Sequence, residues 1–442
     1  MTSEIAILNR EAVALAADSA VTVGTPFYDR PKVFPSANKL FPLSKVHPVG
    51  VMVYGNATLI GTPWETIIKM YRKKLGGSGF DTIEEYTEDF VKFLTDNRTL
   101  FPEFLQLRNL KSSVYGYFSF MLDEIFQKIQ SIIKNEGEIP EDKEETILKN
   151  IIMEVIERHY DIWTNSPRSE NIDEKFEKKI KRKYKKTFIQ LIQERFEKLP
   201  IPNKGKDKLV EIATLLFTRF PEEIINQGTS GIVIAGFGEK EVFPSLISLD
   251  IECIIEGQPK YRRGIYHKIG EESDAAVIPF AQRGMIDTFM GGIAPKYIDE
   301  IKRYMSEVLE EYTKLIISRL NKYNEKEKQD LVARLEEDNK IIIENLINGI
   351  KSFREEEYAQ PILAIVGVLP KDELAALAES LVHLTSLRRK YTPELETVGG
   401  PIDVAVISKG DGFIWIKRKQ YFKPEMNYHV IFGGEGNESP EG

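Results

Sequence analysis

The strongest constraint on the fold is where the strand-like segments lie along the 442 residues of the chain. Short apolar runs rich in β-branched residues occur at both ends and in the middle, and the stretches between them are charged and have helical periodicity. Strands so far apart can share sheets only if the intervening helices lie outside them. We therefore expect an α+β fold with two sheets packed face to face, helices outside them, and helical insertions.

The strand segments are predicted in pairs. Two apolar runs at 4–8 and 12–17 are joined by a short polar turn, which is typical of a buried hairpin. Lys409-Gly410-Asp411-Gly412 contains the Asp-Gly dipeptide favoured in hairpin turns and lies between the last two runs. The other predicted strands are 39–43, 49–55, 231–237 and 243–249, and the closing hairpin is 402–408 with 413–417.

Helices are predicted at 64–75 and 370–389 and throughout two long charged segments. Thr62-Pro63-Trp64-Glu65 has the residues of a helix start, with Thr62 as N-cap, Pro63 at the first helical position and Glu65 completing a capping box. The expected organisation is one core with insertions. It runs as the N-terminal core at 1–80, a helical insertion at 81–228, central strands at 229–296, a second insertion at 297–357, a C-terminal helix and strands at 358–432, and a disordered tail at 433–442.

Composition excludes several classes of protein. The net charge of −8 argues against a general nucleic-acid binder, and we interpret the basic run 178–186 as a solvated helix face rather than a patch for nucleic acid or an acidic partner. Cys253 is the one cysteine, so an intramolecular disulfide is excluded, and its apolar surroundings indicate a core residue. No stretch is apolar enough for a membrane span or a signal peptide, so we expect a cytoplasmic protein.

The sequence contains no motif for a metal or a cofactor. No histidine lies in metal-ligand spacing with another, and neither HExxH nor CxxC occurs. Gly76-Gly77-Ser78-Gly79 lacks the spacing and the lysine of a phosphate-binding loop. We therefore expect neither a metal nor a cofactor. The histidines are His47, His159, His267, His383 and His429.

Threonine at position 2 is the candidate for chemistry. It follows Met1 and leads directly into the first predicted strand, and we expect the usual removal of an initiating methionine before so small a residue. A threonine with a free α-amine carries its own general base, since that amine titrates near ~7.7–8.0 and can accept the proton from Oγ. Asp18, within Ala16-Ala17-Asp18-Ser19, follows sixteen residues after Thr2.

In this order the residues resemble the proteasome-type (proteasome β-subunit-like) family of N-terminal-nucleophile hydrolases. In that family a processed N-terminal threonine is followed by a hairpin ending in an Ala-Ala-Asp element, then by a lysine before a strand, and by a glycine at the end of the next strand. The resemblance covers residues 1–75, 231–249 and 370–418, and it leaves 81–228 and 297–357 uncovered. It implies a four-layer αββα sandwich of two antiparallel sheets with helical insertions.

The resemblance assigns roles to Thr2, Asp18, Lys39 and Gly55. Thr2 Oγ would attack a peptide carbonyl, and a buried Lys39 would lower the pKa of the α-amine so that it stays basic. Asp18 would hold Lys39, because a buried ammonium without a partner is costly. The Gly55 N–H would donate to the oxyanion. Lys32 competes with Lys39 for the lysine role, and we prefer Lys39 because its strand alternates better.

Two departures from the family pattern stand out. The spacing from Thr2 to Lys39 is longer than in the family, which places an insertion in the 20–36 loop. The family also has an Asp and a Ser before a late Gly-Gly, here Gly399-Gly400, where this chain has Leu395 and Val398. Glu394, Glu396 or Thr397 could take the place of the family's Asp and Ser, and the sequence does not choose between them.

The favoured function is a threonine-type peptidase or amidohydrolase acting on a peptide or an unfolded protein. The resemblance implies a homo-oligomeric ring or stack with enclosed active sites, and access gated by other proteins, an ATP-dependent unfoldase among them. The alternative is a non-catalytic scaffold subunit of the same fold, in which the inserted helices dock partners. A third interpretation, an amidase for a small metabolite, shares the chemistry.

Overall fold

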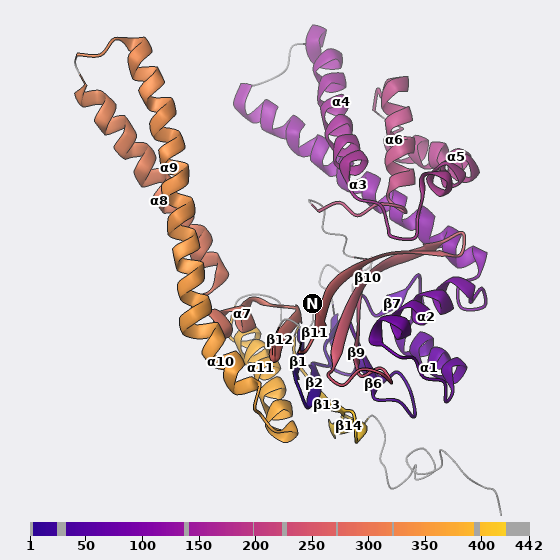
Figure 1. The fold of residues 1–442 in the computed structure, drawn as a ribbon. Coiled ribbons are helices and arrows are strands. Elements are labelled where there is room, and N and C mark those ends of the chain that lie inside the picture. Colours follow the sequence, from indigo (N-terminus) through magenta and orange to yellow (C-terminus); the bar gives the residue numbers. More distant parts are fainter. Residues whose placement is uncertain are drawn as a thin grey trace, which may run out of the picture. The chain divides into compact units, whose positions relative to one another are not determined.

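The computed structural model describes residues 3–23, 32–136, 141–197, 199–222, 228–270, 273–320, 322–392 and 398–420. The chain divides into two compact units (elements labelled in Figure 1). Unit 1 comprises Met1–Leu40, Val242–Pro244 and Lys268–Gly442, and unit 2 comprises Phe41–Glu241 and Ser245–His267. Each unit is built on one antiparallel sheet with helices, which confirms the α+β class and the two sheets.

The sheet of unit 1 joins the two ends of the chain. Its strand order is β12-β1-β2-β13-β14, with antiparallel neighbours. The two predicted hairpins, at the start and near the end of the sequence, are therefore confirmed and lie next to each other through β2 and β13. The strands are β1 (Ser3–Asn9), β2 (Ala12–Ala17), β12 (Ala275–Ala281), β13 (Asp403–Ser408) and β14 (Gly412–Lys417).

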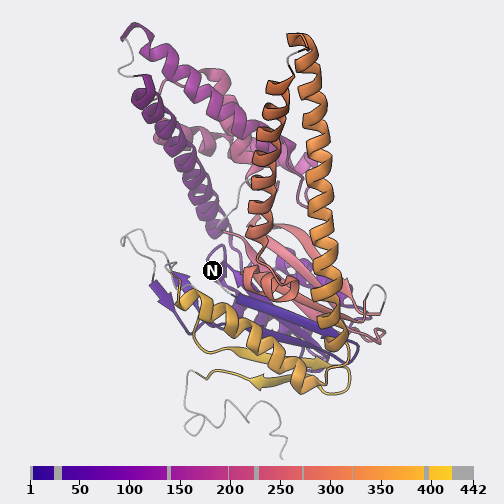
Figure 2. The same ribbon diagram turned by 90° about the vertical axis from the view of Figure 1, so that its left-hand side faces the viewer.

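The predicted C-terminal helix is α11 (Lys371–Lys390), and it covers one face of this sheet (Figure 2). Ile5 and Ile7 of β1 pack against it together with Ala14 and Ala16 of β2. Alanine in β2 leaves room for the helix to approach closely, since the small side chain adds little height above the sheet. The opposite face of the same strands is also apolar, with Ala6, Leu8, Val13 and Leu15.

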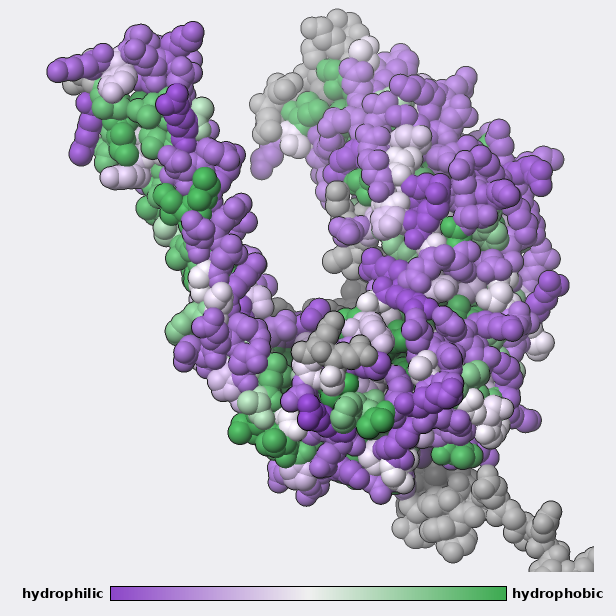
Figure 3. All heavy atoms as spheres, viewed as in Figure 1, coloured by the Kyte–Doolittle hydropathy of each residue, from purple (hydrophilic) through white to green (hydrophobic). Residues whose placement is uncertain are grey.

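The segment 297–357, which was predicted to be helical, contains a helical hairpin of α8 (Pro295–Arg319) and α9 (Glu325–Arg354). Asn339 Nδ2 donates to Thr313 Oγ1 across the pair at 3.0 Å, but within the two helices only Thr313 and Ile343 are buried. Figure 3 shows apolar side chains along this hairpin. The exposed large apolar and aromatic residues are Tyr297, Tyr304, Val308, Tyr312, Leu315, Ile341, Ile342, Leu346 and Phe353.

The remaining elements of unit 1 are short. A π-helical turn follows α9 and leads into α10, and a two-stranded ribbon of β3 and β4 follows the first hairpin. Their bounds are β3 (Val21–Val23), β4 (Lys32–Phe34), α7 (Gly284–Gly291), the π-helical turn (Glu355–Ala359) and α10 (Gln360–Val366).

The sheet of unit 2 has the order β11-β10-β9-β6-β5. The strands predicted from the sequence are present, and β10 continues through the apolar run that contains Cys253. Strand β11 was not located from the sequence, because its charged residues interrupt the apolar alternation. The bounds are β5 (Leu40–Pro42), β6 (Val49–Gly55), β9 (Ser230–Gly236), β10 (Ser245–Ile255) and β11 (Gln258–Lys268), with a short ribbon of β7 (Thr58–Leu59) and β8 (Thr62–Pro63).

Helices pack on one face of this sheet, and the helical character of 81–228 is confirmed. Apolar residues of α1 and α2 form one core with Val51, Ile234 and Leu249 of the strands. The other face of the strands carries Met52 and Val233. The helices are α1 (Trp64–Leu75), α2 (Ile83–Asp96), α3 (Glu103–Glu136), α4 (Glu141–Asn165), α5 (Glu174–Phe196) and α6 (Asn203–Leu215).

Helix α1 has the predicted bounds, but its predicted start is wrong. Pro63 is the N-cap, with an extended backbone and no side-chain cap, and Trp64 is the first helical residue. The hydroxyl of Thr62 donates instead to the carbonyl oxygen of Leu100 at 3.0 Å. The side chain that was expected to cap the helix therefore forms a hydrogen bond with a residue distant in the sequence instead.

The basic run lies on α5 and is largely neutralised within unit 2. Lys181 pairs with Glu211, and Lys183 pairs with Glu103 at 3.1 Å and with Glu256 at 2.5 Å. These contacts favour the solvated-face interpretation, since the charges already have partners. Within the described part of the chain, no helix has both the length and the apolar character that a bilayer crossing requires. The predicted tail at 433–442 lies outside the described residues.

Candidate functional site

Asp18 is the centre of the candidate site. It follows the last residue of β2, is 1% exposed and accepts hydrogen bonds from three segments of unit 1. Its Oδ1 atom accepts the N–H of Ser3 at 3.1 Å and Nζ of Lys39 at 2.5 Å, and its Oδ2 atom accepts the N–H of Gly399 at 2.9 Å. Hydrogen bonds from several segments hold this carboxylate in one orientation.

Lys39 is buried with two carboxylates. Its exposed fraction is 6%, and besides Asp18 it forms an ion pair with Glu4, whose Oε1 lies 3.2 Å from Nζ. The side chains of Glu4 and Asp18 are fully buried. The structure therefore brings together Asp18 and Lys39, two of the four residues named from the sequence.

The geometry of the first hairpin places these groups. Glu4 of β1 lies opposite Ala17 of β2, so the strand reaches Asp18 one residue later, where the Asp18 N–H donates to the Ser3 carbonyl oxygen at 3.1 Å. Ile5 and Ile7 point to α11, and Glu4 therefore lies on the opposite face of the sheet. The site thus begins at Ser3, the residue directly after Thr2, and Thr2 itself lies outside the described residues.

The other candidate lysine is placed differently. Lys32 lies in β4, where all three side chains are exposed. Strand β4 pairs with β3 in the small ribbon, with Lys32 opposite Val23. The structure therefore does not bring Lys32 into the buried cluster of Glu4, Asp18 and Lys39.

The late Gly-Gly segment reaches the site through its backbone. The Gly399 N–H donates to Asp18, and its carbonyl oxygen accepts the N–H of Ser19 at 3.2 Å. Ser19 Oγ also donates to the carbonyl oxygen of Pro401. Val398 is buried and brings no polar side chain to the site. The open alternatives Glu394, Glu396 and Thr397, with Leu395, lie outside the described residues.

Gly55 ends strand β6 in unit 2, where the backbone turns. Its φ is +78°, and a Cβ built on it would lie 2.5 Å from the carbonyl oxygen of Thr229. Both features exclude a side chain, because L-residues rarely adopt this conformation and the backbone oxygen cannot yield. Gly55 is exposed, and the chain continues through Asn56, whose N–H donates to the same Thr229 oxygen at 3.1 Å.

Two acidic residues of the site were missed from the sequence. Glu4 and Asp403 flank Ala17 in register, one on each neighbouring strand, so the three residues share a face. Asp403 is 2% exposed and pairs with Lys419, whose N–H it also accepts at 2.8 Å. The signal that could have revealed both is a carboxylate within an otherwise apolar run, since such charges are rarely buried unless paired.

The donor set does not suggest a metal. Within the described ranges, no three His, Cys, Asp or Glu side chains gather in a way that could hold an ion. The arrangement instead offers one fixed ammonium, a carboxylate that orders backbone N–H groups, and a second carboxylate on the ammonium. Comparison with known proteins adds nothing to this chemistry, because no protein-family model matches the chain and no curated protein is significantly similar to it.

Proposed function

We propose that the chain is a threonine-type N-terminal-nucleophile hydrolase that cleaves peptide bonds, with Thr2 as nucleophile and its own α-amine as base. The observation that carries this proposal is the buried ion pair of Lys39 and Asp18. The carboxylate of Asp18 accepts the N–H of Ser3, which is the first residue after Thr2. Burying an ammonium and two carboxylates is costly, and a strand end needs no such cluster for stability. A charged cluster that is buried at such a cost is a candidate for a functional site.

The contacts within the cluster indicate which group would act as the general base. Lys39 Nζ is held between the carboxylates of Asp18 and Glu4, so its hydrogen-bonding capacity is already in use. The general base must then come from another group, and an α-amine on Thr2 has the right intrinsic pKa, about 7.7–8.0. The amine would take the Oγ proton as the oxygen attacks the carbonyl carbon, and would return it to the leaving amine. Water would then release the acyl group from Thr2.

Gly55 is proposed as the oxyanion donor. Its exposed backbone at the end of β6 has no side chain, so a substrate backbone can approach it closely. This role requires the sheets of the two units to stack face to face, as in an αββα sandwich. The apolar faces opposite the helices support such stacking, with Leu8 and Leu15 in one sheet and Met52 and Val233 in the other.

We propose further that the chain assembles with copies of itself. The α8–α9 hairpin exposes large apolar side chains along its length, and contiguous exposure of this kind marks interaction surfaces. Enclosing the active sites of a peptidase in an assembly keeps folded proteins away from them and so prevents unselective cleavage. An ATP-dependent unfoldase as a gating partner and a cytoplasmic location belong to the same proposal.

The test is the intact mass of the protein before and after incubation with a peptide epoxyketone, which reacts fully only with a residue that offers a hydroxyl and a free α-amine. We expect a chain that begins at Thr2 and gains one adduct. Thr2→Ala should lose both the adduct and peptide hydrolysis. Thr22→Ala, which removes a threonine hydroxyl from β3, is the matched control and should retain both.

A chain with Thr2 free and no adduct would overturn the proposal and leave the scaffold interpretation. Hydrolysis of small amides without hydrolysis of peptides would instead assign the metabolite amidase. Unchanged turnover in Thr2→Ala would exclude Thr2 as the nucleophile.

A further inference from the structure

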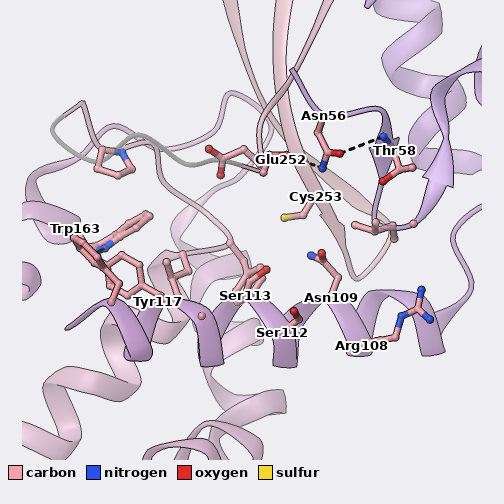
Figure 4. A pocket seen from close by; sticks show the side chains of 18 residues that line it. Asn56, Thr58, Arg108, Asn109, Ser112, Ser113, Tyr117, Trp163, Glu252 and Cys253 are labelled. Carbon is pink, nitrogen blue, oxygen red and sulfur yellow. Dashed lines mark hydrogen bonds between the residues drawn. The ribbon is translucent and has the colours of Figure 1, made fainter. Parts of the chain in front are cut away.

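A second feature lies entirely within unit 2, and its lining does not include any of the residues Thr2, Asp18 and Lys39. A pocket of about 930 Å³ opens between one face of α3 and the turn that follows β6. Figure 4 shows side chains of α3 on one side and Asn56, Thr58, Glu252 and Cys253 on the other. We call it the α3 pocket. Its volume lies within the range of specific ligand sites, roughly 300–1,000 Å³.

One end of the α3 pocket carries a single cation. Arg108 of α3 is exposed, and it forms no ion pair with any described residue. Its guanidinium lies against Gly61, where an added Cβ would come within 3.0 Å of Nη2. Glu252 also lines the pocket, but its charge is taken by the fully buried Lys260. Arg108 is therefore available to a ligand, and the group that a guanidinium binds best is a carboxylate, in a bidentate manner.

The other end is aromatic and rigid. Trp163 is 2% exposed, and its Nε1–H donates to Tyr117 Oη at 2.7 Å. Tyr117 Oη is also hydrogen-bonded to His159 Nδ1 at 2.7 Å, and the ring of Phe120 stands beside them. A fixed aromatic wall of this kind is suited to a large apolar side chain.

The distance between the two ends sets the length of the ligand. Arg108 and Tyr117 are nine residues apart on α3, which is about 13 Å along the axis and about half a turn around it, so they border the pocket from its two edges. An extended peptide advances about 3.3 Å per residue and covers this distance in about four residues. Between the ends, Asn109, Ser112 and Ser113 of α3 supply polar groups beside apolar lining residues such as Ile60 and Leu216. A peptide backbone can satisfy these groups, whereas an alkyl chain would leave them without partners.

We propose that the α3 pocket binds an extended peptide segment of about four residues, with a carboxylate at one end and a large apolar side chain at the other. The carboxylate can be a C-terminus or an acidic side chain, because Arg108 recognises both. This binding needs neither Thr2 nor catalysis, so it stands or falls independently of the proposed function.

The proposal is tested by titration calorimetry of the full chain with defined peptides. Acetyl-Phe-Ala-Ala-Glu-amide carries a side-chain carboxylate, acetyl-Phe-Ala-Ala-Ala with a free acid carries a terminal one, and acetyl-Phe-Ala-Ala-Gln-amide is the neutral isostere. We expect at least one of the first two to bind about tenfold tighter than the third. The tighter of the two identifies the source of the carboxylate. Running the titrations also with Thr2→Ala excludes hydrolysis as the source of heat.

Variants of α3 locate the binding. Arg108→Gln should abolish the preference for the carboxylate, and Lys111→Gln, which removes the same charge from an exposed position outside the pocket, should leave it intact. Gly116→Leu should block binding and raise the unfolding midpoint, because a Cβ there meets nothing within 4 Å and leucine favours the helix. This variant keeps the test decisive if Arg108→Gln folds poorly.

Three results would overturn the proposal. They are equal binding of the carboxylate peptides and the glutamine peptide, unchanged binding in Gly116→Leu, and binding of dodecanoate as tight as that of the peptides. The last result would replace the peptide with an alkyl carboxylate.

Discussion

Lys39 Nζ lies 2.5 Å from Oδ1 of Asp18 in the interior of unit 1. The same carboxylate accepts N–H groups from Ser3 and Gly399, so one side chain joins the start of the chain, the segment before β5 and the loop before β13. The ion pair therefore orients the residues around the chain start and also contributes to stability. Removal of the ion pair should therefore change both the arrangement of the residues around Ser3 and the free energy of unfolding.

Lys39→Met should destabilise the protein by about 3–5 kcal/mol, because it leaves Asp18 and Glu4 as buried carboxylates without their cation. The measurement is the free energy of unfolding in urea. Lys32→Met removes a lysine from an exposed strand and should change it by less than about 0.5 kcal/mol. Equal effects of the two substitutions would contradict the buried pairing.

Gly55→Ala should destabilise the protein by more than about 1 kcal/mol, because the alanine Cβ would meet the Thr229 carbonyl oxygen at 2.5 Å with φ at +78°. Gly77→Ala is the matched control, since a Cβ there meets nothing within 4 Å. Thermal unfolding of the two variants gives the comparison. If Gly55 is also the oxyanion donor, turnover should fall further than the loss of folded protein explains. A neutral Gly55→Ala variant would contradict the positive φ.

Cys253 should not react in the folded protein. Burial raises the pKa of its thiol to about 12, so almost no thiolate exists at pH 8. We expect no release of thionitrobenzoate from Ellman's reagent under native conditions and one equivalent after denaturation, since the chain has one cysteine. Rapid labelling of the native protein would contradict the burial of the thiol and show that reagent reaches it from the α3 pocket or through an opening of β10.

His159 should make stability depend on pH below neutrality. Burial lowers its pKa from the ordinary value of 6.5, and the hydrogen bond and charge of Glu124 only partly oppose this effect. As pH falls below 6.5 the unfolded chain binds a proton that the folded chain resists, so stability falls until the lower folded pKa is passed. The slope for this one group is at most about 1.4 kcal/mol per pH unit.

The comparison variant for this prediction is His159→Gln, which retains a donor and an acceptor but does not titrate. Urea unfolding at a series of pH values from 7.5 to 5 should show a smaller decline in the variant than in the wild type. Parallel curves would mean that His159 takes up its proton equally well in the folded state.

Local sequence patterns were sufficient for most secondary structure. Helix α1 and strand β6 have the predicted bounds, because their signals are contained in a dozen residues. The predicted capping box at Thr62 was wrong for a tertiary reason, since the carbonyl oxygen of Leu100 takes the hydroxyl. Strand β11 escaped notice because its outward residues are charged.

By itself the sequence determined the two end hairpins and α11, and the resemblance to a family implied the pairing of Asp18 with Lys39 as a hypothesis. Only the tertiary structure decided that Glu4 shares that lysine and that the Gly399 N–H reaches Asp18 from 381 positions away. Alternation and capping are properties of neighbouring residues and can be read along the chain. A buried charge is stable only with its partners, and these are supplied by strands whose neighbours in the sheet are distant in the sequence.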